Sequence, residues 1–191
     1  MNSGGATHAL ACLVLVMVTA GAAEARQSRD PFARGTVAAE FSFSPMVEIW
    51  NLNGRRELLV DVTAAMWGAI GRGFCLGVEF SHLRIFQQTP GAFVQGLSPL
   101  IRWRFADQPN WDWFIEAGPG ASWSDLDTPP RGTRFNYLFQ AGAGAMRQVA
   151  HNQHFVLAYR FLHLSNNHRE GRERNPDLEM MGVYAGWSFS F

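Results

Sequence analysis

The chain has 191 residues, of which 47% are hydrophobic and 17% are charged, and its formal net charge is +0. This length fits one domain, the low charged fraction excludes a disordered chain, and the balanced charge argues against a nucleic-acid binder. The high counts of 15 Phe, 7 Trp and 19 Gly favour a β-protein in contact with lipid over a soluble enzyme.

The first residues have the pattern of an export signal. An almost wholly apolar run extends from Ala9 to Ala23, which is too short for a convincing membrane helix. The small-x-small sequence Ala23-Glu24-Ala25 then matches a cleavage site. We therefore expect residues 1–25 to be a signal peptide and residues 26–191 to form the mature domain.

The mature chain divides into eight strand-like segments separated by turn signals. Among these signals are Asn53-Gly54, Pro90-Gly91 and a broad polar stretch from Asp125 to Gly132. Transmembrane strands need about 9–11 residues, and every segment reaches that length. We expect strands at Thr36–Ile49, Arg56–Ala69, Phe74–Gln87, Ala92–Phe105, Trp111–Trp123, Phe135–Val149, His154–Leu164 and Glu179–Phe191.

Alternation is clearest in the last two segments, where one face is aromatic or aliphatic and the other is small or polar. The apolar faces carry Phe155, Leu157, Tyr159 and Phe161 in the seventh segment, and Met181, Val183, Ala185, Trp187, Phe189 and Phe191 in the eighth. Apolar-out and polar-in alternation is typical of outer-membrane barrels, and the aromatic C-terminal strand resembles their assembly signal. The fold class is therefore predicted to be all-β, an eight-stranded antiparallel transmembrane β-barrel of the outer-membrane type.

A barrel of eight strands is filled by side chains, so we do not expect a pore. Polar residues of the middle strands are expected to form an interior network, namely Arg102, Arg104, Asp112, Glu116 and Arg160. Tryptophans are expected in the aromatic girdles at the membrane interfaces, namely Trp67, Trp103, Trp111, Trp113 and Trp123.

Reactive side chains are most concentrated in the run His163-Leu164-Ser165-Asn166-Asn167-His168, which is followed by Asn175-Pro176-Asp177-Leu178-Glu179. His163 and Ser165 lie two apart on one strand, so their side chains emerge on the same, lipid-facing side. Glu179 has the matching parity on the next strand. Because both chain ends of such a barrel are periplasmic, these residues fall near the extracellular rim, where polar groups facing lipid suggest a function.

At these residues the sequence resembles the outer-membrane lipid A 3-O-deacylases of the PagL type. The resemblance is sharpest in the His-x-Ser-Asn run, the Asn-Pro-x-x-Glu run and the final strand, and extends to Phe114–Gly120 and Gly142-Ala143-Gly144. It implies a lipid A esterase of the Gram-negative outer membrane with Ser165 as nucleophile, His163 as general base and Glu179 as the group that orients the imidazole.

Other roles near this site are less sharply defined. Asn166 and Asn175, with backbone N–H groups of the intervening loop, are candidate oxyanion donors and substrate-binding groups. The loop before Glu179 is longer than in the family pattern, so Asp177 or Glu173 could compete for its role. The nearby arginines could bind substrate phosphates, namely Arg169, Arg172 and Arg174.

The serine mechanism needs no cofactor and no metal, although His163, His168 and Glu179 could in principle form a metal site that lacks a specific zinc spacing. Two alternative functions stay open. One is an outer-membrane phospholipase with similar chemistry, and the other is a non-enzymatic structural barrel. The sequence also leaves open whether the barrel forms a homodimer.

Overall fold

The structure is a computed structural model that describes residues 34–50, 56–86, 90–108 and 111–191, with the side chains of 106–108 not described. The expected signal peptide and the expected Asn53-Gly54 turn lie outside these residues. No helix in the described part is long and apolar enough to cross a membrane.

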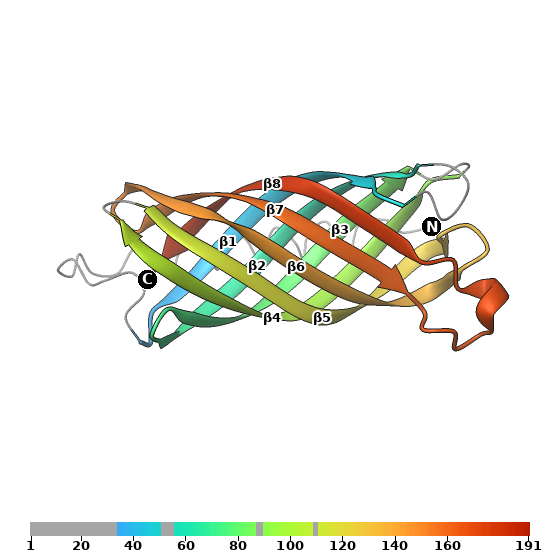
Figure 1. Ribbon diagram of the computed structural model, residues 1–191, viewed down its shortest axis with the longest axis horizontal. Coiled ribbons are helices and arrows are strands. Elements are labelled where there is room, and N and C mark those ends of the chain that lie inside the picture. The colour runs from blue at the N-terminus through green and yellow to red at the C-terminus, as the bar shows by residue number, and fades with distance from the viewer. Residues whose placement is uncertain (1–33, 51–55, 87–89, 109–110) are drawn as a thin grey trace, which may run out of the picture.

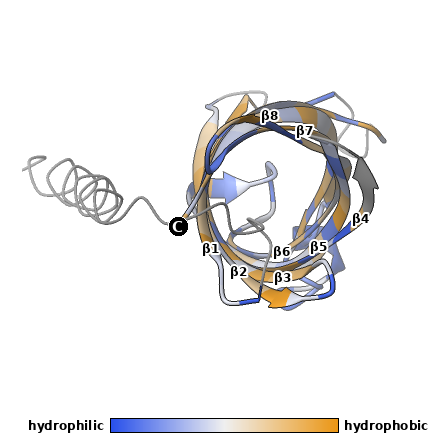
Figure 2. Ribbon diagram, turned by 90° about the vertical axis from the view of Figure 1, so that its left-hand side faces the viewer, coloured by the Kyte–Doolittle hydropathy of each residue, from blue (hydrophilic) through white to orange (hydrophobic). Residues whose placement is uncertain are grey.

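Eight antiparallel strands form one closed barrel in the order of the chain (Figure 1), and the end-on view shows them as a ring (Figure 2). The ring is closed by pairing of the first strand with the last. The strands are β1 Val37–Glu48, β2 Leu58–Gly71, β3 Phe74–Phe86, β4 Ala92–Gln108, β5 Trp111–Thr128, β6 Thr133–Ala150, β7 Gln153–Ser165 and β8 Leu178–Ser190. The predicted fold class is confirmed.

The strand bounds agree closely with the expected ones except at the turn between β5 and β6. The sequence predicted a turn from Asp125 to Gly132, whereas β5 continues to Thr128 and the turn occupies only 129–132. The Asn136 side chain donates to the backbone carbonyls of Thr128 and Thr133, both at 2.9 Å, and so holds the two strand ends together. This polar cross-link stabilises paired strands in a stretch whose composition is typical of a loop.

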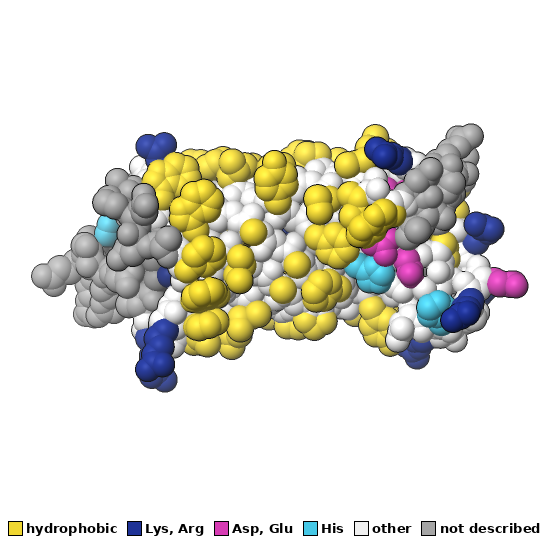
Figure 3. Space-filling view, viewed as in Figure 1, with side chains coloured by type: hydrophobic (Ala, Val, Ile, Leu, Met, Phe, Trp, Pro, Cys, Tyr) yellow, Lys and Arg dark blue, Asp and Glu magenta, His cyan; other side chains and the backbone are white. Residues whose placement is uncertain are grey.

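The two faces of the wall separate as the alternation predicted. On β7, Leu157 and Tyr159 are exposed, and Tyr159 reaches 69% exposure, while Val156 and Ala158 are buried. Figure 3 shows the result as a broad band of hydrophobic side chains across the face of the barrel in view, with charged side chains beyond both of its edges. Since a lipid environment favours such a band, the wall is that of an outer-membrane barrel.

Charged side chains in the barrel interior form one connected network, as predicted for Arg102, Glu116 and Arg160. Glu116 accepts from Arg102 Nη2 at 2.7 Å and from Arg160 Nη2 at 2.9 Å. Arg102 also binds Glu40 at 2.8 Å, and Arg160 binds Glu79 at 2.9 Å. Buried charges are stable only when paired and hydrogen-bonded, so each arginine fixes carboxylates on separate strands.

The same pattern extends toward the end of the barrel that holds the C-terminus. There Arg104 lies 3.7 Å from Asp112, which confirms the remaining members of the predicted network. Both ion-paired regions fill the lumen with side chains rather than leaving a channel.

Trp67 is a correction to the predicted interfacial girdle. It is buried in the barrel, where its ring lies 4.0 Å from the guanidinium of Arg102. Gly77 on the neighbouring strand leaves room for this ring, since a Cβ there would fall 2.5 Å from it. The cation–π contact gives Trp67 an interior partner that its sequence neighbours do not reveal. Trp103, Trp111, Trp113 and Trp123 are exposed on the outside, as predicted.

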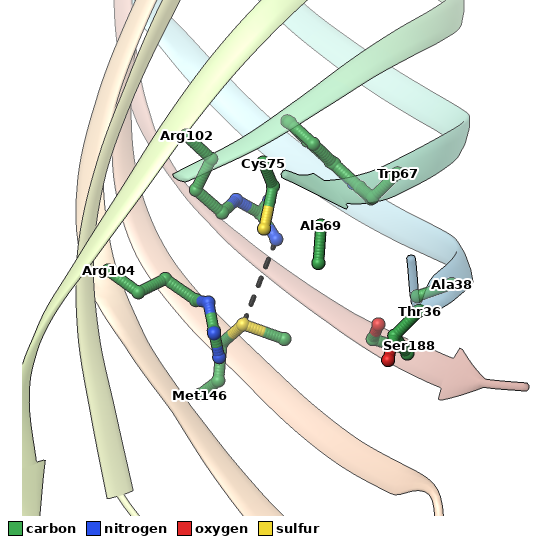
Figure 4. Close-up of a pocket in the computed structure, with 9 residues that line it drawn as sticks. All are labelled: Thr36, Ala38, Trp67, Ala69, Cys75, Arg102, Arg104, Met146 and Ser188. Atoms are coloured by element: carbon green, nitrogen blue, oxygen red, sulfur yellow. Dashed lines mark hydrogen bonds between the residues drawn. The ribbon is translucent and has the colours of Figure 1, made fainter. Parts of the chain in front are cut away.

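Trp67 and Arg102 line a small recess inside the barrel at the end near the C-terminus (Figure 4). Its volume is about 20 Å³, which is enough for roughly one water molecule. Buried Cys75 also lines it. The recess is therefore too small to pass or hold a lipid.

We expect Glu116→Gln to lower the free energy of unfolding by about 3–5 kcal/mol, because it removes the carboxylate shared by two buried arginines. Urea unfolding in phospholipid vesicles, followed by Trp fluorescence, measures this change. Glu173→Gln, an exposed glutamate in the long loop, is the matched control and should have no effect. Equal unfolding midpoints for both variants would contradict a structural role for the network.

Candidate active site at the extracellular rim

The residues predicted to form the site come together on the outer wall where β7 ends and β8 begins. In the strand register His163 pairs with Glu179 on β8 and with Phe139 on β6, while Ser165 pairs with Tyr137 on β6. Figure 1 shows that the loop between β7 and β8, with its short 3-10 helix η2 (Arg172–Arg174), lies at the end of the barrel opposite the C-terminus. If the C-terminus is periplasmic, this end is extracellular.

His163 and Glu179 form a direct pair. Nδ1 of His163 lies 3.0 Å from Oε1 of Glu179, and their side chains are 31% and 12% exposed. A neutral imidazole that donates from Nδ1 keeps Nε2 as an acceptor. Oε2 of Glu179 is buried and has no hydrogen-bond partner in the described part of the chain. Burying such an oxygen costs free energy, and a positive charge on the neighbouring imidazole would offset that cost.

Ser165 is buried beneath the loop that follows it, with 8% exposure. Its hydroxyl donates to Oδ1 of Asn175 at 3.1 Å and accepts from the backbone N–H of Asn167 at 3.1 Å. The structure therefore brings His163 to Glu179 and places Ser165 on the same wall, two residues away. It does not join Ser165 to His163 by a hydrogen bond within the described residues.

Asn175 and Asn166 hold the loop between β7 and β8 against the rim. Oδ1 of Asn175 also accepts from the backbone N–H of Asn166 at 2.8 Å. The Asn166 amide nitrogen donates to Thr133 Oγ1 at 3.2 Å and to the carbonyl oxygen of Arg174 at 2.6 Å. Both asparagines predicted from the sequence thus lie beside Ser165, and each links two segments of the rim.

The backbone after Ser165 turns sharply. Asn167 and His168 both have positive φ, at 54° and 59°. Asn tolerates this left-handed region better than most residues, which fits the Asn-rich run seen in the sequence. The turn aims the N–H of Asn167 at the Ser165 hydroxyl.

The two alternatives to Glu179 lie elsewhere. Asp177 accepts from the Asn175 side chain at 2.6 Å, and Glu173 lies exposed within η2. Only Glu179, of these three acids, has a hydrogen bond to His163. In the described part of the chain, no group of three His, Cys, Asp or Glu side chains could hold a metal ion.

Sequence reasoning missed the β6 side of the site. Thr133 and Tyr137 approach it only because β6 pairs with β7, although counting the register back from the turn near residue 151 could have placed Tyr137 beside Ser165. It also missed the anchoring role of Arg174, which pairs with Glu170 and Asp127 and donates to the carbonyl of Gly132 at 3.2 Å. No local motif announces these contacts.

The family model for lipid A 3-O-deacylase (PagL) matches residues 57–188. The chain belongs to this family. Members of this family are lipid A deacylases of the outer membrane. The protein is therefore an outer-membrane hydrolase, as the sequence resemblance implied. No curated protein matches the sequence.

Several solved structures share this barrel fold. Neisserial surface protein A (NspA) matches with a TM-score of 0.62 and 11% identity, covering 82% of this chain and 96% of that chain. The outer membrane enzyme PagL matches with a TM-score of 0.56 and 16% identity, covering 79% and 97%. Ail, the attachment invasion locus protein of Yersinia pestis, matches with a TM-score of 0.53 and 11% identity, covering 83% and 99%. These likenesses support the fold alone.

We expect Asn175→Ala to loosen the loop between β7 and β8, since it removes the acceptor shared by Ser165 and the Asn166 backbone. Losing such bonds costs about 1–3 kcal/mol, which raises the open population of the loop roughly 5- to 150-fold. Limited trypsin digestion of the folded barrel in vesicles, read out as cleavage after Arg169, measures this opening. Glu173→Ala serves as the control, and an equal cleavage rate in both variants would refute the anchoring role of Asn175.

Proposed function

We propose that this protein removes the acyl chain ester-linked at position 3 of lipid A, with Ser165 as nucleophile, His163 as general base and Glu179 as the orienting acid. The observation that carries the proposal is the 3.0 Å contact between His163 and Glu179 on the lipid-facing wall, two residues from a serine. A base whose Nδ1 is held by a carboxylate, next to a hydroxyl, is the arrangement that activates a serine nucleophile.

In the first half of the reaction, Ser165 Oγ attacks the ester carbonyl while Nε2 of His163 accepts the hydroxyl proton. Glu179 accepts from Nδ1–H and stabilises the resulting imidazolium without taking its proton. The tetrahedral intermediate then breaks the bond between the carbonyl carbon and the sugar oxygen. His163 returns the proton to that oxygen, so the sugar leaves as an alcohol and the fatty acyl group stays on Ser165.

In the second half, water attacks the acyl–Ser165 ester and His163 again accepts a proton. The bond to Oγ breaks, His163 returns the proton to Oγ, and the fatty acid is released. No redox step or external reductant is involved, and water is the only co-substrate.

Before attack, the Ser165 hydroxyl must turn from Asn175 toward His163. Side chains two apart on a strand have Cα atoms separated by about 6.6 Å, a gap that a histidine ring and a hydroxyl can close by rotating toward each other. Catalytic hydrogen bonds are often loose in unliganded enzymes, so the bond to Asn175 fits a resting state. Substrate entry would then exchange one hydrogen bond of Ser165 for another.

The N–H of Asn167 is the oxyanion donor that the geometry supports best. It already lies 3.1 Å from Ser165 Oγ. Asn166 uses its amide nitrogen for two other acceptors, and Asn175 directs its amide nitrogen to Asp177. An oxyanion donor is worth roughly 10²–10³ in rate. Asn166 and Asn175 would then hold the loop that presents this N–H.

Substrate would reach the site from the membrane. His163 is partly exposed on the wall and is flanked by exposed Phe139 on β6, which is typical of a lipid-contacting surface. An acyl chain lying against this wall keeps its apolar environment while the ester reaches the rim.

We expect Ser165→Ala to reduce deacylation by about 10⁴-fold or more, because the nucleophile is lost. Mass spectrometry of lipid A from Gram-negative cells that express each form measures the loss of one hydroxyacyl chain, and fragmentation locates the position. His168→Ala is the control, with folding checked by heat-modifiable gel mobility. A phospholipase would instead cleave glycerophospholipids in the same extracts, and a structural barrel would change neither lipid.

We expect Glu179→Gln to reduce kcat about 10³- to 10⁴-fold, since the imidazole would lose its tautomer and its counter-charge. Fatty acid release from purified lipid A by the refolded enzyme measures this effect. Glu173→Gln tests the rival acid and should leave the rate unchanged. If the Glu173 variant lost activity and the Glu179 variant did not, the assignment of the orienting acid would be wrong.

A further inference from the structure

A polar cavity opens beside Ser165 on the β6 side and is not used by the proposed catalytic steps. It has a volume of about 370 Å³ and is lined by Thr133, Phe135, Asn166, Arg169 and Glu170. Asn166 directly follows Ser165, and Tyr137, two residues beyond Phe135, pairs with Ser165 in the strand register. A molecule whose ester lies at Ser165 could therefore place a neighbouring polar group here.

Arg169 is held at this cavity by the outer face of β6. Its Nη1 donates to the Tyr137 hydroxyl at 3.2 Å, and its guanidinium lies 5.8 Å from the Phe135 ring. Phe135 and Tyr137 themselves pack edge to face at 5.3 Å between ring centroids. This aromatic pair is a platform that orients the guanidinium and leaves most of its five N–H donors for a ligand.

Two other charged groups of the loop, Glu170 and Arg174, are already paired with each other. Glu170 lines the same cavity, but its carboxylate is bound by Arg174, which also lies 3.6 Å from Asp127. Within the described residues, no carboxylate forms an ion pair with Arg169. The cavity is therefore lined by the cationic guanidinium of Arg169 and by Glu170, whose negative charge is neutralised by Arg174.

We propose that Arg169 binds a phosphate monoester on the sugar headgroup of the substrate and so selects phosphorylated glycolipids. This inference rests on the proposed function, because it places the ester of the same molecule at Ser165. A planar guanidinium can bind a phosphate through two parallel hydrogen bonds, and such charge-assisted bonds are the strong ones. Of the three arginines of the loop, only Arg169 lines this cavity. Arg174 is already paired with Glu170, and Arg172 lies exposed in η2. Tyr137 is a positioning residue for Arg169.

The test compares two substrates, lipid A and the same lipid A after enzymatic removal of its phosphates. We expect Arg169→Ala to lower kcat/KM about 10- to 100-fold on the phosphorylated substrate, mainly through KM, and to leave the dephosphorylated one unchanged. Arg169→Lys should recover part of the loss, and Tyr137→Phe should show a smaller loss with the same substrate dependence. Arg172→Ala, at an exposed arginine of the same loop, is the matched control. An equal loss of Arg169→Ala on both substrates, or no loss, would overturn the proposal.

A binding measurement separates this inference from the proposed reaction. In the Ser165→Ala background, binding of phosphorylated lipid A in mixed micelles should weaken by the same factor when Arg169 is replaced. Free inorganic phosphate, added as competitor, should reduce binding only where Arg169 is present. If wild type binds phosphorylated lipid A through Arg169 but hydrolyses no ester, the proposed reaction fails while the phosphate site stands. If it hydrolyses lipid A without regard to phosphate, only the phosphate site fails.

Discussion

The closed hydrogen-bonded sheet is the constraint on which the rest of this molecule depends. A bilayer offers no partner for free backbone N–H and C=O groups, so strands can cross it only when the sheet has no edge. Pairing of β1 with β8 closes the ring, and the period of two then assigns every side chain to the lumen or to the lipid. Side chains of one parity, including Glu116 and its ion-pair partners, point into the lumen. Side chains of the opposite parity, including His163 and Glu179, face outward.

This division explains why the lumen and the rim have different chemistry. Inside, charged groups meet partners on other strands, and Arg102 and Arg160 each lie between two carboxylates, so the network fixes structure and leaves little room. At the rim, the wall meets the loop between β7 and β8, and hydrogen bonds of Asn175 and Asn166 hold that loop over Ser165. Ser165, the proposed nucleophile, is thereby shielded from water, yet it stays next to the surface along which a lipid could approach.

The rim also combines two kinds of recognition in a short span. The aromatic wall suits acyl chains, whereas Arg169 on its Phe135 and Tyr137 platform suits an anion. These surfaces meet at Ser165 because β6 and β7 are neighbours in the barrel and Tyr137 lies directly across from it. In this arrangement the register between two strands sets the spacing between the ester and the polar headgroup.

The sequence by itself determined the strand count and the lipid-facing parity, because alternation is a local property of the chain. The same parity, with the family resemblance, led to the proposal of His163, Ser165 and Glu179 as the site. The sequence could not predict contacts between residues that are far apart along the chain. Trp67 lies inside because Arg102 and the space over Gly77 receive it, and β5 continues to Thr128 because the Asn136 side chain bridges the strand ends. Likewise, only the tertiary structure revealed the hydrogen bond between Ser165 and Asn175 and the one between Arg169 and Tyr137 on β6. These partners are separated along the chain and meet only when the sheet closes and the loop folds back.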